Sequence, residues 1–409
     1  MANFRSFRAL RPRPELAAEV ASVPYDVVDA AEARALAAGN AHSFLHVIRP
    51  EIDLPPETDI HDDEVYAQAP RALEQLVQQG TLIRDDEKAL YLYRQIMDGH
   101  PQIGIVGCAA VDDYDQDLFK KHEKTRPDKE DDRTRHVLTL SAHAGPVFAT
   151  YRGTARIDAI VDSVTSSEGP LYDFVAADGV SHTVWRVPDP AELEAAFKEV
   201  PALYVADGHH RAASASRARA ARREQAENFT GDEEVNFFLT VLFPGEQLKI
   251  LPYNRVVHDL HGATPAEFLE RLRTVMTVAP GATPTPERKG VFSMYLDGEW
   301  FRLEAPREAV EAEHPVDSLD AAILQQRVLA PMLGIDSPRT STRIDFVGGI
   351  RGTDELQKRV DARGEGVAFS LFPLSVDELL SVADAGLVLP PKSTWFEPKL
   401  RSGLLVHEF

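Results

Sequence analysis

The sequence predicts a mixed α/β (α+β) protein, and three observations lead to this fold class. Segments with helical and strand patterns alternate along the chain, but they do not follow the strict βαβ order of a parallel sheet. Two pairs of alternating segments are joined by Asp-Gly, the typical sequence of a tight hairpin turn. The 409 residues, 44% hydrophobic and 27% charged, are enough for more than one buried core.

The composition excludes several classes of function. The chain carries 65 acidic residues against 44 Lys and Arg, a formal net charge of −21, which argues against coating nucleic acid or anionic membranes. A single cysteine, Cys108, excludes a disulfide framework and a Cys-rich zinc site, and its apolar strand predicts an inert core thiol. The N-terminus lacks a signal-peptide core, and no apolar run approaches the roughly 18 residues of a membrane span. We expect a cytoplasmic protein.

Residues 1–95 form the first predicted region. A helix is expected to stop at Gly39-Asn40 and to be followed by a short strand, FLHVI, at 44–48. A second helix is expected to end at Gly80. Tyr25 and Asp26 follow Pro24, a pattern typical of a turn.

Residues 96–258 form the second predicted region, with an insertion at 153–201. It begins with a charged run at 120–136, in which 12 of 17 residues are charged, and a strand follows Gly145-Pro146. The insertion reads as a helix, a hairpin turning at Asp178-Gly179, and a second helix. An apolar strand at 202–206, an Ala/Arg-rich helix and a buried strand complete this region.

Residues 259–409 form the third predicted region, which contains a hairpin across Asp297-Gly298. The segment FVGGIRG, with Arg351, is either a tight turn or a place where the backbone approaches a ligand. The tail at 389–403 contains Trp395 and Phe396, which favour burial, so we expect it to dock on the body of the protein. Docking would bring Lys392, Ser393 and Lys399 toward a site.

The most informative segment is YVADGHHRAA at 204–213. A buried strand leads directly into a helix, with Asp207 at the expected N-cap, Gly208 in the turn, and His209, His210 and Arg211 in the first turn. Unpaired N–H groups, the positive end of the helix and a guanidinium together predict a phosphate site. The alternative is that Asp207 only caps the helix and the histidines are local polar packing. Zinc is disfavoured because adjacent helical histidines point about 100° apart.

The strand–DGHHR–helix element resembles the phosphate-binding motif of the ParB/sulfiredoxin superfamily, and within it the free L-serine kinases. Those kinases carry an upstream His-Glu dipeptide, which is matched here by His122-Glu123 in KKHE. The resemblance implies a ParB/sulfiredoxin-like nucleotide-binding core with N-terminal and C-terminal α/β extensions. It further implies that Glu123 is the base acting on a hydroxyl, and that Asp207 and His210 are functional. The insertion at 153–201 is a departure, because the small kinases have a short turn there.

The whole chain resembles the bacterial family known as domain of unknown function 1015. The segments SVPYDVV, KKHEKTRPDKEDDR, YVADGHHRAASA, LPYNRVV, FVGGIRG and PPKSTWFEPKLRSGL carry this resemblance nearly from end to end. The name of the family records no activity, so the kinase hypothesis rests on DGHHR and His-Glu alone.

These residues predict a small-molecule kinase that uses ATP or ADP with Mg²⁺, with free L-serine as the first acceptor to consider. Gly208, His209, His210 and Arg211 would hold the phosphates, and Asp207 would either bind Mg²⁺ or orient a histidine. The candidates for a substrate or phosphate clamp are His122, Lys124, Arg126, Lys129, Arg133, Arg351 and Lys392. The alternatives are a non-catalytic nucleotide-binding switch and a nucleotide hydrolase. The expected partners are a nucleotide and a small hydroxyl compound, without nucleic acid or membrane, and a homodimer stays open.

Overall fold

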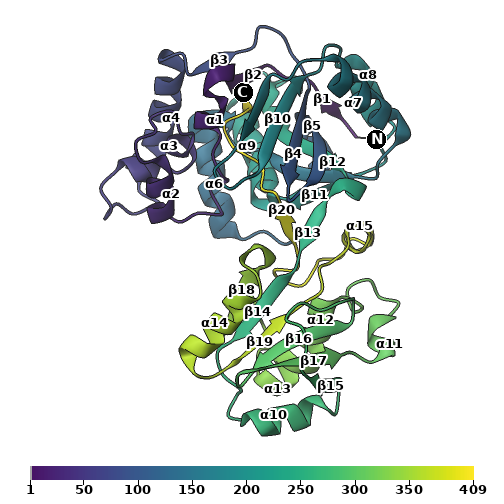
Figure 1. Cartoon of the computed structure of the whole chain (residues 1–409). Coiled ribbons are helices and arrows are strands. Elements are labelled where there is room, and N and C mark those ends of the chain that lie inside the picture. The colour runs from purple at the N-terminus through teal and green to yellow at the C-terminus, as the bar shows by residue number, and fades with distance from the viewer. Residues whose placement is uncertain (1) are drawn as a thin grey trace. The chain divides into compact units, whose positions relative to one another are not determined.

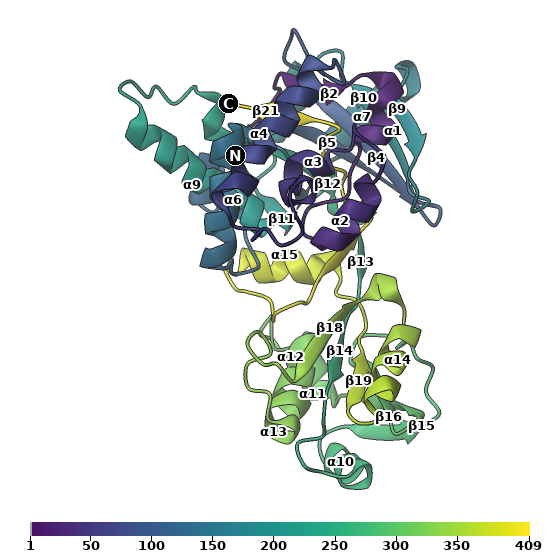
Figure 2. The same cartoon turned by 90° about the vertical axis from the view of Figure 1, so that its left-hand side faces the viewer.

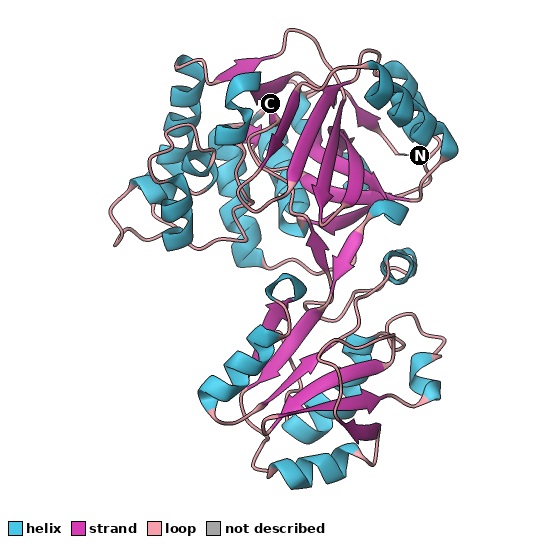
Figure 3. Cartoon of the chain, in the orientation of Figure 1, coloured by secondary structure: helices cyan, strands magenta, loops and turns pink. Residues whose placement is uncertain are grey.

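The computed structural model describes residues 2–409, which fold into two compact units (Figure 1). The first unit comprises residues up to 248 together with 398–409, and the second comprises residues 249–397. Each unit combines sheets with helices (Figure 3), so the predicted mixed α/β class is confirmed. The finer division into three regions stays a prediction.

A nine-stranded mixed sheet forms the centre of the first unit. Its strand order is β6-β11-β8-β12-β5-β4-β10-β9, and β1 also pairs with β5. The strands are β1 (Phe4–Arg5), β4 (Tyr91–Met97), β5 (His100–Ala110), β6 (Phe119–Lys120), β8 (Val147–Tyr151), β9 (Tyr172–Val175), β10 (Ser181–Arg186), β11 (Leu203–Asp207) and β12 (Phe237–Pro244). Every residue of β12 is buried, as its apolar run FFLTVLFP requires of a central strand.

The helices of the first unit surround this sheet. They are α1 (Ala17–Val20), α2 (Ala30–Ala37), α3 (Leu45–Ile48), α4 (Asp63–Gln78), α5 (Val111–Asp115), α6 (Pro127–Leu140), α7 (Ala155–Ser167), α8 (Ala191–Phe197) and α9 (His209–Gln225). Short 3-10 turns occur at Pro14–Leu16, Pro50–Asp53, Glu234–Asn236 and Gly245–Gln247. The expected hairpin within 153–201 is present as β9 and β10, with α7 before it and α8 after it.

The helices α6 and α9 pack side by side (Figure 2), which brings the charged run against the DGHHR helix. The buried face of α9 consists of small residues (Ala212, Ala213, Ser214, Ala215 and Ala218), which allow a close approach. The hydroxyl of Ser214 donates to the carbonyl of Glu130 at 3.4 Å, and Arg217 forms an ion pair with Glu130 at 3.3 Å. Two segments that are far apart in the sequence are therefore held together.

A second, four-stranded sheet ties the C-terminus to the first unit. Its order is β3-β2-β21-β7, from β2 (Ala9–Pro12), β3 (Leu82–Arg84), β7 (Ala142–His143) and β21 (Val406–Glu408). Leu400, Leu404 and Val406 are buried. The segment 398–409 therefore packs within the first unit, and docking of the whole tail at 389–403 stays a prediction.

The predicted strand at 44–48 is wrong. Leu45–Ile48 form the short helix α3, and Phe44, Leu45 and Val47 are buried. A short apolar run is buried equally well in either conformation, so periodicity alone cannot distinguish a strand from a helical turn here.

The second unit is built on a six-stranded sheet of order β15-β17-β16-β19-β14-β18 and a two-stranded ribbon of β13 and β20. The strands are β13 (Lys249–Leu251), β14 (Tyr253–Val257), β15 (Thr277–Pro280), β16 (Val291–Leu296), β17 (Glu299–Glu304), β18 (Ile344–Gly348), β19 (Val367–Ser370) and β20 (Trp395–Glu397). The helices are α10 (Pro265–Leu272), α11 (Arg307–Val310), α12 (Asp320–Leu324), α13 (Ala330–Leu333), α14 (Asp354–Arg363) and α15 (Val376–Asp384), with a π-helical turn at Gln325–Leu329 and a 3-10 turn at Gly349–Arg351.

The second predicted hairpin is also present, formed by β16 and β17. Asp297 and Gly298 have φ angles of 50° and 82°, the left-handed pair that a two-residue hairpin turn of this kind requires. Within residues 2–409, no helix is both long and apolar enough to cross a membrane.

Gly107 in β5 provides a test of the packing in the central sheet. A Cβ at this position would lie 2.5 Å from Leu90 Cδ2, 2.5 Å from Phe4 Cζ and 2.9 Å from the carbonyl oxygen of Arg5. We expect Gly107→Ala to lower the free energy of unfolding by about 1–3 kcal/mol in urea denaturation. Gly169→Ala is the matched control, because nothing lies within 4 Å of that Cβ. Equal stability of the two variants would contradict the packing described.

Candidate functional site

The junction of β11 and α9 is a turn that only glycine makes easily. Gly208 has a φ angle of 92° and occupies the N-cap position of α9, without a side-chain cap. A Cβ here would also lie 3.2 Å from Arg211 Cζ. The prediction that Asp207 is the N-cap is wrong: Asp207 is the last residue of β11, and its Oδ1 accepts a hydrogen bond from the N–H of Gly208 at 2.9 Å. With no side-chain cap, the first N–H groups of α9 are available to an anion.

Asp207 is held between two cations. The ammonium of Lys399 lies 3.1 Å from Asp207 Oδ2, and Arg211 Nη2 lies 4.0 Å from the same oxygen. Burial by itself would raise the pKa of the carboxyl, but Lys399 and Arg211 outweigh it and hold the pKa of Asp207 well below its ordinary value. Asp207 is therefore ionised, and it positions two cations at the start of α9.

The side chain of Arg211 is largely buried, and three groups orient its guanidinium. Its guanidinium donates to the carbonyl of Pro146 and, at 3.4 Å, to Asp26 Oδ2, in addition to the contact with Asp207. The side chain of Arg211 is only 11% exposed, and its Nε has no partner among residues 2–409. A guanidinium fixed in this way is preorganised for an oxyanion.

The predicted His-Glu dipeptide lies against the DGHHR motif. The rings of His122 and His209 meet edge to face, with centroids 4.4 Å apart, and Glu123 Oε2 lies 4.0 Å from His209 Nδ1. Burial lowers the pKa of His122 to about 4 and the pKa of His209 well below its ordinary value, so both rings are neutral at pH 7. Both ring nitrogens of His122 are buried without a hydrogen-bond partner in the described chain.

His210 connects the motif to the turn before α6. The backbone N–H of Arg126 donates to His210 Nε2 at 3.1 Å, which requires this nitrogen to be unprotonated. Burial lowers the pKa of His210, consistent with the neutral form. His210 therefore fixes the position of the charged segment relative to α9.

The predicted clamp residues divide into three groups. Lys124, Arg126 and Lys129 are exposed, and Arg126 forms an ion pair with Asp128 at 2.8 Å. Arg133 is half-buried, with its guanidinium 4.2 Å from the centre of the Tyr25 ring. Arg351 and Lys392 belong to the second unit.

The later arginines of α9 do not face the turn at Gly208 as free cations. Arg217 forms an ion pair with Asp131, and Arg219 with Asp112 and Asp115. Arg222 donates to Ser141 Oγ at 2.6 Å. Of the basic residues in this helix, Arg211 is the one that lies beside Asp207.

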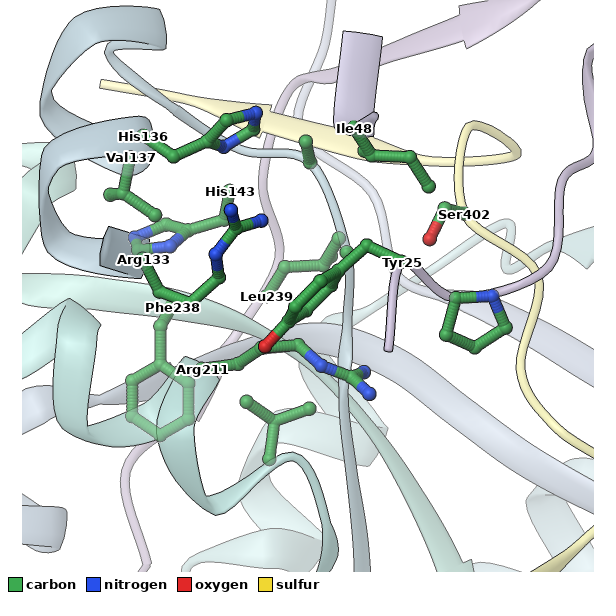
Figure 4. Close-up of a pocket in the computed structure, with 14 residues that line it drawn as sticks. Tyr25, Ile48, Arg133, His136, Val137, His143, Arg211, Phe238, Leu239 and Ser402 are labelled. Carbon is green, nitrogen blue, oxygen red and sulfur yellow. The ribbon is translucent and has the colours of Figure 1, made fainter. Parts of the chain in front are cut away.

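A cavity of about 40 Å³ lies beside Arg211 (Figure 4). Tyr25 reaches between Arg133 and Arg211, and burial raises the pKa of the Tyr25 hydroxyl, so that it stays protonated. The rest of the wall is largely apolar; the lining residues labelled in Figure 4 are Tyr25, Ile48, Arg133, His136, Val137, His143, Arg211, Phe238, Leu239 and Ser402. The cavity therefore combines cationic and apolar groups in its wall.

Tyr25, Asp26 and Ser402 are not among the residues predicted for this site, and the contact between Lys399 and Asp207 is not predicted either. Tyr25 and Asp26 were interpreted as a turn, although SVPYDVV was among the segments characteristic of the family. Lys399 was expected only to come near the site. One feature of the sequence could have indicated them. Tyr25, Asp26 and Lys399 belong to segments characteristic of the family but lie outside any predicted helix or strand, and binding residues are often found in such loops.

No cluster of three or more His, Cys, Asp or Glu side chains suited to a metal ion occurs among residues 2–409. Both oxygens of Asp207 already have partners, Gly208 N–H and Lys399. The candidate site is therefore defined by groups that attract an anion.

The protein is thus of the mixed α/β class, and its candidate site lies at the strand-to-helix turn between β11 and α9, where Arg211 and Lys399 flank Asp207. The chain belongs to the DUF1015 family, described as a protein of unknown function, whose model matches residues 4–322. No curated protein matches the chain.

Several solved structures are distantly similar. SbnI from Staphylococcus aureus, truncated at its C-terminus, is 12% identical with a TM-score of 0.40, covering 74% of this chain and 86% of that one. A free serine kinase variant in complex with ADP is 13% identical with a TM-score of 0.35, covering 74% and 92%. A conserved hypothetical protein from Pyrococcus furiosus is 14% identical with a TM-score of 0.34, covering 74% and 94%.

The buried state of His122 generates a prediction for the pH dependence of stability. In the unfolded chain the imidazole binds a proton near pH 6.5, but in the folded protein only near pH 4, so folding loses stability as the pH falls from 6.5 to 4. Phe cannot bind a proton, so we expect His122→Phe to lose less stability than the wild type as the pH falls. The difference in the free energy of unfolding, measured by urea denaturation at pH 7, 5.5 and 4.5, should reach up to about 3 kcal/mol at the lowest pH. The same pH dependence in variant and wild type would contradict a neutral, buried His122.

The pairing of Asp207 with Lys399 generates a second prediction. We expect Lys399→Met to lower the free energy of unfolding by about 1–2 kcal/mol at pH 7, because it leaves a partly buried carboxylate with one cation fewer. Asp207→Asn combined with Lys399→Met should cost less than the sum of the single changes. Because the pKa of Asp207 is depressed in the folded state, the coupling should be full at neutral pH and decline only below about pH 4. Additive effects of the two changes would argue against the pair.

Proposed function

We propose that this protein is a phosphotransferase that moves the terminal phosphoryl group of ATP or ADP to the hydroxyl of a small molecule, with free L-serine as the first acceptor to test. The observation that carries the proposal is the position of Glu123. Its Oε2 lies 4.0 Å from Nδ1 of His209, and His209 belongs to the first turn of α9. A carboxylate suited to activate a hydroxyl thus lies next to groups suited to hold phosphates, although the two segments are far apart in the sequence.

The phosphate chain would bind at the start of α9. The unpaired N–H groups of the first turn and the guanidinium of Arg211 would contact its oxygens, as such groups do in other phosphate sites. Lys399 would add a second cation on the side of Asp207. These charges would neutralise the transferred group, which is the main requirement of phosphoryl transfer.

Glu123 would act on the acceptor. As the hydroxyl oxygen forms a bond to the terminal phosphorus, the bond from that phosphorus to the bridging oxygen of the nucleotide breaks, and the hydroxyl proton passes to Glu123. The products are the phosphorylated acceptor and the shortened nucleotide. His122 and His209, both neutral, can donate or accept hydrogen bonds beside Glu123 without adding charge.

Mg²⁺ at Asp207 stays a prediction, and the residues present do not favour it. Asp207 Oδ1 accepts from Gly208 and Oδ2 contacts Lys399 at 3.1 Å, and the positive charges of Lys399 and Arg211 oppose a further cation at this carboxylate. Asp207 would instead position Lys399 and Arg211.

The test compares Glu123→Gln with the wild type. The purified chain is incubated with ATP or ADP, Mg²⁺ and L-serine, and O-phosphoserine is measured by mass spectrometry. We expect Glu123→Gln to lower kcat by about 100-fold or more, with nucleotide affinity retained, because the amide cannot accept the proton. Asp131→Asn is the matched control: Asp131 is an exposed carboxylate of α6 that pairs with Arg217. Arg211→Met should instead weaken nucleotide binding.

The other outcomes distinguish the rival functions. Nucleotide binding without any turnover would identify a regulatory nucleotide switch and overturn the kinase proposal. Release of phosphate without acceptor dependence would identify a hydrolase. Activity of Glu123→Gln equal to that of Asp131→Asn would remove Glu123 from the reaction, whichever product forms.

A further inference from the structure

The second unit has a cavity of its own, which the proposed function does not use. It measures about 30 Å³ and includes Tyr253, Arg255, Lys289, Asp320, Glu378 and Ser393 in its wall. We call it the Arg255 pocket. Segments that the phosphotransferase site leaves unexplained meet around it. LPYNRVV forms β14 and pairs with the FVGG segment of β18, and the PPKST segment supplies Ser393.

Arg255 is a buried cation without an anionic partner. It is 3% exposed, and among residues 2–409 no carboxylate contributes to the shift of its pKa. Its Nη1 donates to the carbonyl of Tyr253, its Nη2 donates to the carbonyl of Pro391 at 3.2 Å, and its Cζ lies 4.9 Å from the centre of the Phe346 ring. Burial lowers the pKa of Arg255 to about 10, which leaves the side chain charged at neutral pH.

An unpaired charge in the interior is unfavourable for folding, and buried arginines are ordinarily matched by carboxylates. The guanidinium has five N–H donors, of which the backbone carbonyls of Tyr253 and Pro391 use two. The remaining donors belong to a side chain that lines a cavity. A planar fork of this kind is suited to the paired oxygens of a carboxylate or phosphate group.

Asp320 presents a second polar group to the same cavity. It is 7% exposed; its Oδ1 accepts from the N–H of Gly290 at 2.8 Å, while its Oδ2 has no hydrogen-bond partner among the described residues. Burial raises the pKa of Asp320 to about 7, so near neutral pH the carboxyl is partly protonated and can donate to an oxygen. The charged groups that act on Asp320 are Lys289 and Glu378, which pair with each other at 2.6 Å, and Arg255 lines the same cavity.

We propose that the Arg255 pocket is a separate binding site for a small oxyanion, the carboxylate or phosphate group of a metabolite, held by Arg255 and contacted by protonated Asp320. The positive charge of Arg255 is then neutralised by the ligand instead of by the protein. The small volume admits the anionic group of a ligand and few other atoms. The proposal is independent of the phosphotransferase function, since all of these residues belong to the second unit.

The test measures binding of sodium acetate and of inorganic phosphate to the full chain by isothermal titration calorimetry at pH 6, with sodium chloride at matched ionic strength as the reference. We expect saturable binding of at least one oxyanion, and the one that binds identifies the group. Arg255→Met should weaken that binding by at least about 30-fold, because the charged partner is lost. Arg288→Met is the matched control: Arg288 is an exposed arginine of the same unit that pairs with Glu304. Phosphate binding that Arg211→Met abolishes would belong to the first unit.

A second variant, Asp320→Asn, tests the binding site even if Arg255→Met does not fold. At pH 8, one unit above its pKa, about a tenth of wild-type Asp320 is protonated, and the ionised form repels an anion. Asp320→Asn should therefore bind the oxyanion about tenfold more tightly than wild type at pH 8, and nearly equally at pH 6. Absence of saturable binding of both oxyanions overturns the proposal. So does equal affinity of Arg255→Met and wild type, or of Asp320→Asn and wild type at pH 8.

Discussion

The first unit depends on one electrostatic arrangement, the carboxylate of Asp207 between Lys399 and Arg211. Asp207 ends β11, Arg211 begins α9, and Lys399 arrives from the C-terminal tail nearly two hundred residues later. The two cations together offset the cost of burying part of this carboxylate. Because each cation also carries positive potential to the same turn, the pairing that supports the fold also prepares the site for an anion.

Because the chain has a large excess of acidic residues, few basic side chains near α9 keep unused hydrogen-bond donors. Most basic side chains of α9 and its neighbours are taken up by carboxylates, as in the ion pairs of Arg217 with Asp131 and of Arg219 with Asp115. Only a cation whose partners leave donors unused can attract a ligand. Arg211 meets this condition in the first unit. Arg255 meets it in the second, where no carboxylate among residues 2–409 contributes to the shift of its pKa.

The neutral histidines show how burial changes the meaning of a motif. His122 and His209 pack edge to face and are too buried to be protonated at pH 7. His210, the more exposed neighbour, accepts a backbone hydrogen bond from Arg126. The His-His-Arg sequence therefore contributes one positive charge, that of Arg211. His209 and His210 contact the segment that carries Glu123 and hold it beside α9.

The fold class, the two Asp-Gly hairpins and the strand–glycine–helix turn could be predicted from the residues alone, because each depends on local periodicity or on a backbone angle that glycine favours. It also identified Glu123, Gly208 and Arg211 as candidates. The folded chain was needed to show that Asp207 is a strand end rather than a cap, that Leu45–Ile48 are helical, and that Lys399, Asp26 and Tyr25 lie beside Arg211 or Asp207. The physical reason is that ion pairs and burial act between residues that are remote in sequence, and no local pattern records which of them meet.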